Sequence, residues 1–157
     1  MQNIVKTIDI DVPVSTAYNQ WTQFETFPEF MEGVKHVRQL DQTHLRWQAE
    51  VGGKDMEWDS EISEQIPDKR IAWWSREGGH NRGVVTFHYL EPSKCRIAMQ
   101  MDYEPQGLQE SVGDALGFMT RKLDKDLENF KKFIEERGEA TGAWRGTVDH
   151  GQVKTAA

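Results

Sequence analysis

The chain has 157 residues, of which 37% are hydrophobic, and 26 acidic against 19 basic residues give a formal net charge of −7. This length is typical of one domain, and the negative charge disfavours nucleic acid and anionic membrane surfaces as partners. Cys95 is the single cysteine, which excludes an intramolecular disulfide, and no segment approaches the roughly 20 apolar residues of a membrane span. Lys6 and Asp9 interrupt the first residues, so we expect no secretory signal and a cytoplasmic protein.

The chain begins with alternating polarity. Ile4, Ile8 and Ile10 fall on one side of an extended segment, which predicts an amphipathic strand that ends at Pro13. Between residues 15 and 33 the spacing of apolar side chains becomes helical, and we expect two short helices there.

A meander of six strands is predicted next, because polarity alternates along each run and turn residues separate the runs. We expect these strands near residues 35–41, 43–51, 54–65, 69–76, 82–91 and 94–104. Gly52-Gly53 suits a two-residue hairpin, and Pro67-Asp68 and Pro92-Ser93 suit type I turns. Sequential hairpins imply an antiparallel sheet.

One face of this meander is apolar and carries mostly large side chains. By alternation, the inward positions include Trp47, Trp58, Ser60, Trp73, Phe87, Tyr89, Met99, Met101 and Tyr103. The opposite face is charged and therefore faces water. Such an interior is either filled by its own side chains or left with a cavity for an apolar guest, and the pattern alone leaves both readings open.

One long amphipathic helix is predicted from Leu108 to about Arg137. Its apolar stripe includes Leu116, Met119 and Leu123, and it must cover the apolar face of the sheet. Residues 1–138 are thus expected to form one domain, and residues 139–157, which lack periodicity, a mobile C-terminal tail.

Six stretches of the chain carry motifs of a known family. They are Val12-Pro13-Val14-Ser15 with Trp21, Phe27-Pro28-Glu29-Phe30-Met31, Trp58 with Glu64-Gln65-Ile66-Pro67, Arg70-Ile71-Ala72-Trp73, Gly83-Val84-Val85-Thr86-Phe87, and Asp102-Tyr103-Glu104-Pro105. They resemble the polyketide cyclase/dehydrase family of the START/Bet v 1-like (SRPBCC) helix-grip superfamily, which is related to coenzyme Q-binding proteins.

The resemblance implies an α+β helix-grip fold: a curved antiparallel sheet of about seven strands, two short helices after the first strand, and one long C-terminal helix. It also implies a deep hydrophobic cavity between the sheet and that helix. The side chains that we expect to contact a guest there are those of Trp47, Trp58, Trp73, Phe87, Tyr89, Met99, Met101, Tyr103, Leu116 and Met119.

The predicted interior contains few groups that could act in catalysis. The inward face offers only the hydroxyls of Ser60, Ser75, Tyr89 and Tyr103, of which Ser60, Tyr89 and Tyr103 are the candidate catalytic groups. Asp59 and His88 are predicted to point outward. The five histidines show no compact ligand spacing, so neither a metal site nor another cofactor is expected.

The sequence supports three hypotheses about function. The first is a protein that binds or transports a hydrophobic small molecule, such as a lipid, an isoprenoid or a polyketide-like compound. The second is a cyclase or dehydratase that uses the inward hydroxyls. The third is a protein-interaction module with a packed interior; a weak homo-oligomer is compatible with all three.

Overall fold

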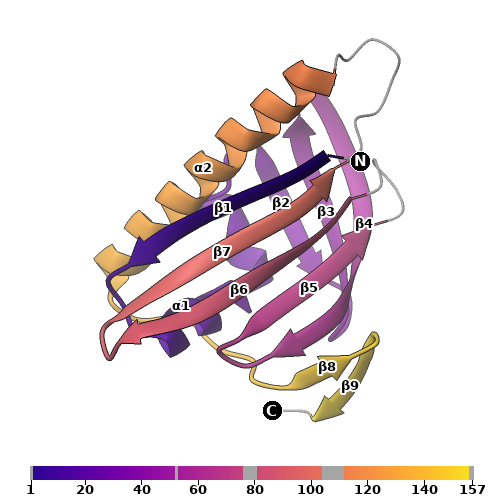
Figure 1. Ribbon diagram of the computed structural model, residues 1–157. Coiled ribbons are helices and arrows are strands. Elements are labelled where there is room, and N and C mark those ends of the chain that lie inside the picture. Colours follow the sequence, from indigo (N-terminus) through magenta and orange to yellow (C-terminus); the bar gives the residue numbers. More distant parts are fainter. Residues whose placement is uncertain (1, 52, 76–80, 104–111, 156–157) are drawn as a thin grey trace.

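The computed structural model describes residues 2–51, 53–75, 81–103 and 112–155. A curved antiparallel sheet is bent around one long helix, α2 (Val112–Arg137), as Figure 1 shows. This arrangement confirms the predicted α+β helix-grip fold. The other helices are α1 (Val14–Trp21) and the 3₁₀-helix η1 (Phe24–Glu29).

The sheet has nine strands in the described part of the chain, not about seven. They are β1 (Gln2–Ile10), β2 (Val34–Gln39), β3 (His44–Val51), β4 (Lys54–Ile66), β5 (Arg70–Ser75), β6 (Asn81–Glu91), β7 (Lys94–Tyr103), β8 (Thr147–Asp149) and β9 (Gln152–Thr155). The seven predicted strands follow the order β1-β7-β6-β5-β4-β3-β2. β1 and β2 are at opposite ends of this path, so among the described strands no pairing closes the sheet, and α2 packs along β1 instead.

The alternation of the sequence sets the register of the strands. β1 pairs antiparallel with β7, so that Ile8 lies opposite Ile97 and Ile10 lies opposite Cys95. Ile10, Cys95 and Ile97 are fully buried, whereas Val5 on the other face of β1 is 56% exposed. The Cys95 thiol is free, and its burial raises the pKa of Cys95 to about 11.

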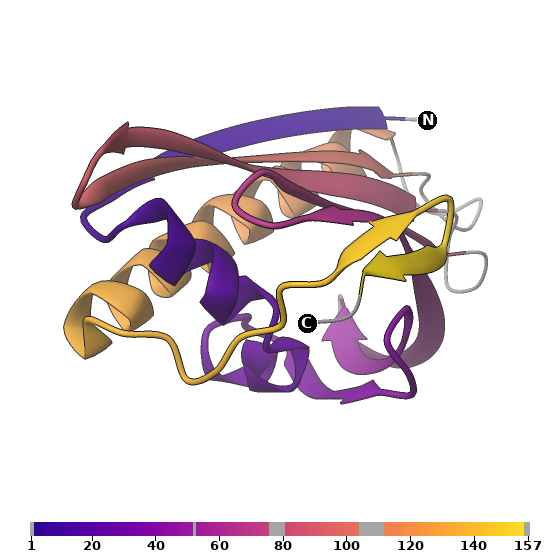
Figure 2. The ribbon, with the colours of Figure 1, turned by 90° about the horizontal axis from the view of Figure 1, so that it is seen from below.

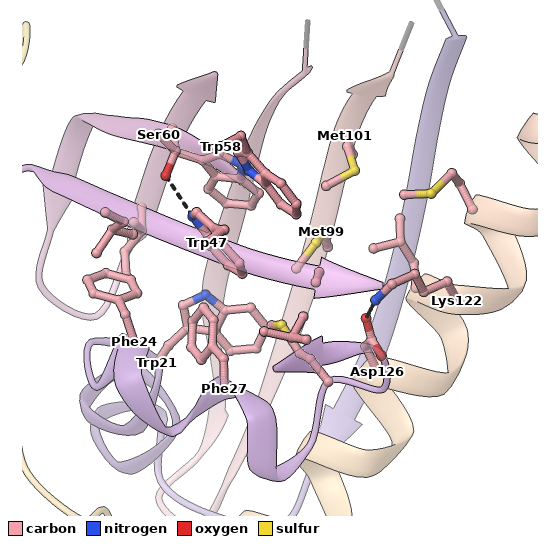
Figure 3. A pocket seen from close by; sticks show the side chains of 18 of the residues that line it. Trp21, Phe24, Phe27, Trp47, Trp58, Ser60, Met99, Met101, Lys122 and Asp126 are labelled. Carbon is pink, nitrogen blue, oxygen red and sulfur yellow. Dashed lines mark hydrogen bonds and ion pairs between the residues drawn. The ribbon is translucent and has the colours of Figure 1, made fainter. Parts of the chain in front are cut away.

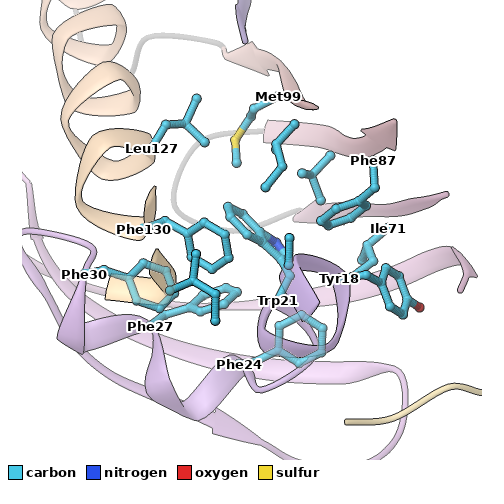
Figure 4. Close-up of a cluster of buried hydrophobic side chains, with 14 of the residues drawn as sticks. Tyr18, Trp21, Phe24, Phe27, Phe30, Ile71, Phe87, Met99, Leu127 and Phe130 are labelled. Carbon is cyan, nitrogen blue, oxygen red and sulfur yellow. The ribbon is translucent and has the colours of Figure 1, made fainter. Parts of the chain in front are cut away.

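A cluster of aromatic rings fills the interior between the two short helices and the C-terminal half of α2 (Figure 4). Trp21 contacts Phe130 and Phe27, with ring centroids 4.8 Å and 5.6 Å apart and steep interplanar angles. Phe87 packs 5.2 Å from Tyr18 in the same cluster. Edge-to-face pairs of this kind contribute about 0.5–1.5 kcal/mol each beyond the burial of their surface. The cluster therefore fixes α2 against the sheet at one end.

The C-terminal segment differs from the prediction. The mobile tail that we expected after residue 138 instead passes below α1 and forms the β8–β9 hairpin, as Figure 2 shows. β8 pairs with β4, where Val148 lies opposite Gln65. Arg145 holds the approach to this hairpin, because its guanidinium donates to Asn19 at 2.6 Å and to Asp68 at 2.8 Å. The prediction failed because polar bonds and a short ladder, which leave no periodic apolar pattern, hold this segment.

The packing of β8 can be tested at Val148, whose side chain is 0% exposed. Val148→Ala should lower the free energy of unfolding by about 2 kcal/mol, because two buried methyl groups are lost and a small cavity remains. The matched control is Val5→Ala on the exposed face of β1, which should cost less than about 0.5 kcal/mol. Urea unfolding followed by far-UV circular dichroism measures both. Equal small effects would show that the hairpin contributes little to the fold.

Candidate functional site

A pocket of about 160 Å³ lies between the sheet and the middle of α2, beside the aromatic cluster (Figure 3). The wall is almost entirely apolar, and the sheet supplies most of it. Its lining includes Trp47, Met56, Trp58, Ser60 and Trp73 from the central strands, Met99 and Met101 from β7, Phe24 and Phe27 from η1, and Met119, Lys122, Leu123 and Asp126 from α2.

Two of the indoles form a rigid wall. Trp47 on β3 lies directly opposite Trp58 on β4, and their rings are stacked with a centroid separation of 5.8 Å and an interplanar angle of 4°. Cross-strand neighbours on one face of an antiparallel pair make such contacts. The Trp47 Nε1–H donates to the Ser60 Oγ at 2.8 Å, which fixes the orientation of the indole. Ser60 is buried and lines the pocket, and among the described residues its hydroxyl proton has no acceptor.

The position of the third indole, that of Trp73, requires a glycine on the neighbouring strand. Trp73 on β5 lies opposite Gly83 on β6, and a Cβ atom on Gly83 would be only 2.6 Å from the Trp73 ring. No L side chain keeps so short a contact, so the missing side chain lets the indole lie against β6. Gly83 therefore helps to keep the pocket open.

One ion pair interrupts the apolar wall on the side of α2. The Lys122 Nζ lies 2.7 Å from the Asp126 Oδ2, and the backbone N–H of Glu32 donates to the Asp126 Oδ1 at 3.3 Å. Asp126 is only 6% exposed. Burial raises the pKa of its carboxyl, although the Lys122 ammonium and the Glu32 N–H oppose that shift. The pair joins α2 to the segment between η1 and β2.

This arrangement suits binding better than catalysis. Among the described residues, the hydrogen-bond partner of Ser60 is an indole and not a base that would activate its oxygen. Asp59 points outward, as predicted, and its Oδ1 accepts from Arg46 at 2.8 Å on the solvated face. What the pocket offers a guest is apolar surface, one hydroxyl and one ion pair.

Six of the ten predicted contact residues line the pocket together: Trp47, Trp58, Trp73, Met99, Met101 and Met119. The side chains of Leu116 and Tyr103 lie outside the described part of the structure. The prediction for Phe87 is wrong in position, because its ring is buried in the aromatic cluster against Tyr18 and does not line the pocket.

The prediction for Tyr89 is also wrong. Its side chain is 63% exposed, so it is neither a pocket residue nor a catalytic candidate. Tyr89 lies next to an irregularity in the β6–β7 ladder, between residues 89 and 91, close to the turn of that hairpin. The regular pairing is lost at that point, while Cys95 opposite Tyr89 stays fully buried, so alternation alone does not predict the exposure of Tyr89.

The ion pair is the part of the site that the sequence prediction missed. Lys122 lies three residues after Met119, and Asp126 lies three residues after Leu123 and four before Phe130. Both charges thus fall within the apolar stripe of α2. A charged residue within an apolar helix stripe indicates a polar group in the interior, and this signal was present in the sequence.

Comparison with known proteins identifies the family. The polyketide cyclase / dehydrase and lipid transport family matches residues 10–132. The chain belongs to this family. An uncharacterized 17.2 kDa protein from Streptomyces lincolnensis is 52% identical over 149 residues, which cover 94% of this chain and 99% of that protein.

Solved structures share the fold of this chain. An aromatase/cyclase from a Streptomyces species has a TM-score of 0.74 at 16% identity, covering 90% of this chain and 98% of its own. A START superfamily protein from Mycobacterium smegmatis has a TM-score of 0.69 at 15% identity, covering 86% and 95%. The present protein, a member of the cyclase/dehydrase family, thus has a START-like fold. None of its described helices is long and apolar enough to cross a membrane.

The close contact between Gly83 and the Trp73 indole can be tested by substitution. Gly83→Ala should displace the Trp73 indole and lower the free energy of unfolding by about 1–3 kcal/mol, because the added methyl overpacks the interface. Gly117→Ala in α2 is the control with the opposite sign, since a Cβ there meets only the flexible end of Arg121, at 3.4 Å. That variant should gain up to about 1 kcal/mol from helix propensity. Near-UV circular dichroism during unfolding reports both stability and indole packing; an unchanged Trp73 environment in Gly83→Ala would contradict the close contact.

The raised pKa of Asp126 predicts an unusual pH dependence. The native state holds the Asp126 proton more tightly than the unfolded chain does. The protonated carboxyl therefore stabilises the fold below the unfolded pKa, near 3.8, and this stabilisation is lost as pH rises through the folded pKa. Asp126→Asn cannot ionise, so its stability relative to wild type should increase across this window. Glu135→Gln is the opposite control: burial raises the pKa of Glu135, but hydrogen bonds from Lys131 and the Asp11 N–H outweigh it and lower the pKa. Urea unfolding between about pH 3 and pH 8 measures both differences; parallel curves for Asp126→Asn and wild type would contradict the prediction.

Proposed function

We propose that this protein binds a hydrophobic small molecule of lipid, isoprenoid or polyketide-like character between the sheet and α2. The observation that carries this proposal is the apolar pocket itself, whose wall is built by large side chains that stop short of filling it. Binding sites for small molecules are concave, largely apolar and supplied with a few placed polar groups. A module with a packed interior would not need such a space.

The size of the pocket limits what enters without rearrangement. About 160 Å³ is close to the roughly 150 Å³ of a cavity that admits benzene. One ring or a short branched segment therefore fits the pocket as it stands. Met99, Met101 and Met119 line it, and unbranched thioether chains repack easily around a larger guest.

A second candidate function is a cyclase or dehydratase. Ser60 favours it, because its buried hydroxyl faces the pocket with a proton to donate. The aromatase/cyclase of the same fold supports this only as an analogy, since the fold hosts more than one function. Binding is the function that both candidates require.

Occupation of the pocket can be tested by filling it. Native mass spectrometry of freshly purified protein should show a co-purified apolar molecule, and the wild type should bind an apolar fluorescent probe. Ala49→Leu, at a buried position in the pocket wall, should weaken probe binding at least about tenfold, because the added carbons occupy the space of the guest. The same substitution at Ala98, between the inward neighbours Ile97 and Met99 and hence on the outer face of β7, should leave binding unchanged.

The outcomes separate the three hypotheses. Binding that is lost only in Ala49→Leu supports the proposed function. An apo protein that binds no apolar probe favours an interaction module and overturns it. Turnover of a poly-β-ketone analogue that Ser60→Ala abolishes would instead support the enzyme.

A further inference from the structure

The ion pair of α2, in which the Asp126 side chain is 8% and the Lys122 side chain 19% exposed, is costly for a protein that only needs a stable core. Lys122 and Asp126 lie among Met119, Leu123 and Leu127 in the wall of an apolar pocket. Removing two charges from water costs several kcal/mol per ion, and well-packed apolar residues at such sites are often equally or more stabilising. The bond from the Glu32 N–H to Asp126 gives the carboxylate a structural partner, but it does not require a lysine beside it. The position of Lys122 in the pocket wall therefore indicates a role toward the guest.

The ammonium of the pair has hydrogen-bond donors to spare. Each oxygen of Asp126 already accepts one bond, Oδ2 from the Lys122 Nζ at 2.7 Å and Oδ1 from the Glu32 N–H at 3.3 Å. The ammonium has three N–H groups, and Asp126 is its one acceptor among the described residues. Lys122 thus keeps N–H donors for a further partner, and it lines the pocket (Figure 3).

The charges decide which acceptor fits. The ion pair is neutral as a unit, and Asp126 holds the ammonium in place. A guest carboxylate would bring a second anion to the same ammonium inside an apolar wall, and burying that unpaired charge is costly. A carbonyl oxygen accepts from the ammonium without adding charge. A purely apolar guest, in contrast, would leave the N–H donors without a partner.

Resting on the proposed function, we infer that Lys122, positioned by Asp126, is the specificity-determining group of the pocket. It selects apolar molecules that carry an uncharged carbonyl oxygen over hydrocarbons and over carboxylates. The Trp47–Ser60 pair belongs to the sheet side of the pocket and the ion pair to the α2 side, with apolar surface between them (Figure 3). The body of such a guest would lie on the indoles and methionines, with its carbonyl toward α2.

The test uses three probes of matched size: acetophenone, ethylbenzene and benzoate. Titrations are followed by the NMR signals of the methionine methyl groups, because Met99, Met101 and Met119 line the pocket. The wild type should bind acetophenone roughly tenfold more tightly than ethylbenzene, and benzoate should bind more weakly than acetophenone. Lys122→Met should remove the preference for the ketone, because acetophenone loses its donor and ethylbenzene no longer leaves N–H groups without a partner.

Two further variants separate recognition from folding. Lys122→Met leaves Asp126 buried without its cation, so the double variant Lys122→Met with Asp126→Leu removes both charges and should show the same loss of preference in a folded protein. Lys125→Met, at an exposed position of α2, is the matched control and should keep the wild-type preference.

Each outcome of the probe series decides one claim. Equal affinity of the wild type for acetophenone and ethylbenzene overturns the inference but leaves the proposed function standing. Tightest binding of benzoate overturns the choice of an uncharged acceptor. A ketone preference that survives in the double variant overturns the assignment to Lys122. Failure of acetophenone and ethylbenzene alike to bind overturns the proposed function itself.

Discussion

The rest of the structure depends on how α2 closes an open sheet. Strand pairing ends at β1 and β2, so the apolar stripe of α2 must cover the concave face. The C-terminal half of the stripe is fully used for this, since Phe130 and Ile134 are completely buried against the core. Further toward the N-terminus, Met119 and Leu123 line the pocket instead. One helix thus anchors the fold at one end and bounds the candidate site nearer the other.

The pocket exists because small residues lie among large ones. Trp21 and Phe27 fill the interior next to α1, and toward β3 and β4 the wall contains Ala49 and Ser60. Gly83 gives the Trp73 indole a place against β6. The stacked indoles of β3 and β4 then form a wall that cannot collapse inward, because the bond to Ser60 and their mutual contact fix them. Protein interiors usually pack without voids, so an opening kept by such means indicates a guest.

The sequence predicted the fold well and the site only in part, for a physical reason. Alternation reports which face of the sheet a side chain points to, and this placed Trp47, Trp58 and Trp73 correctly. It does not report what covers that face at each position along a strand. Phe87 and Tyr89 share one face of β6, yet Phe87 is in the aromatic cluster and Tyr89 is in solvent near the end of the hairpin. The contacts of Phe87 with α1 and the irregular pairing beside Tyr89 separate these cases, and alternation reports neither.

Charges in an apolar stripe are more informative about function than the stripe itself. Apolar surface is non-directional, so it gives little discrimination between apolar guests of similar size. Lys122 and Asp126 are different, because the energetics of burial argue against them unless they are used. Their i, i+4 spacing aligns them on one face, and the Glu32 N–H donates to the other oxygen of the carboxylate. The ammonium is thereby held in place, and this directs its remaining N–H groups. Specificity in this pocket therefore follows from the two charged positions in the apolar stripe of α2.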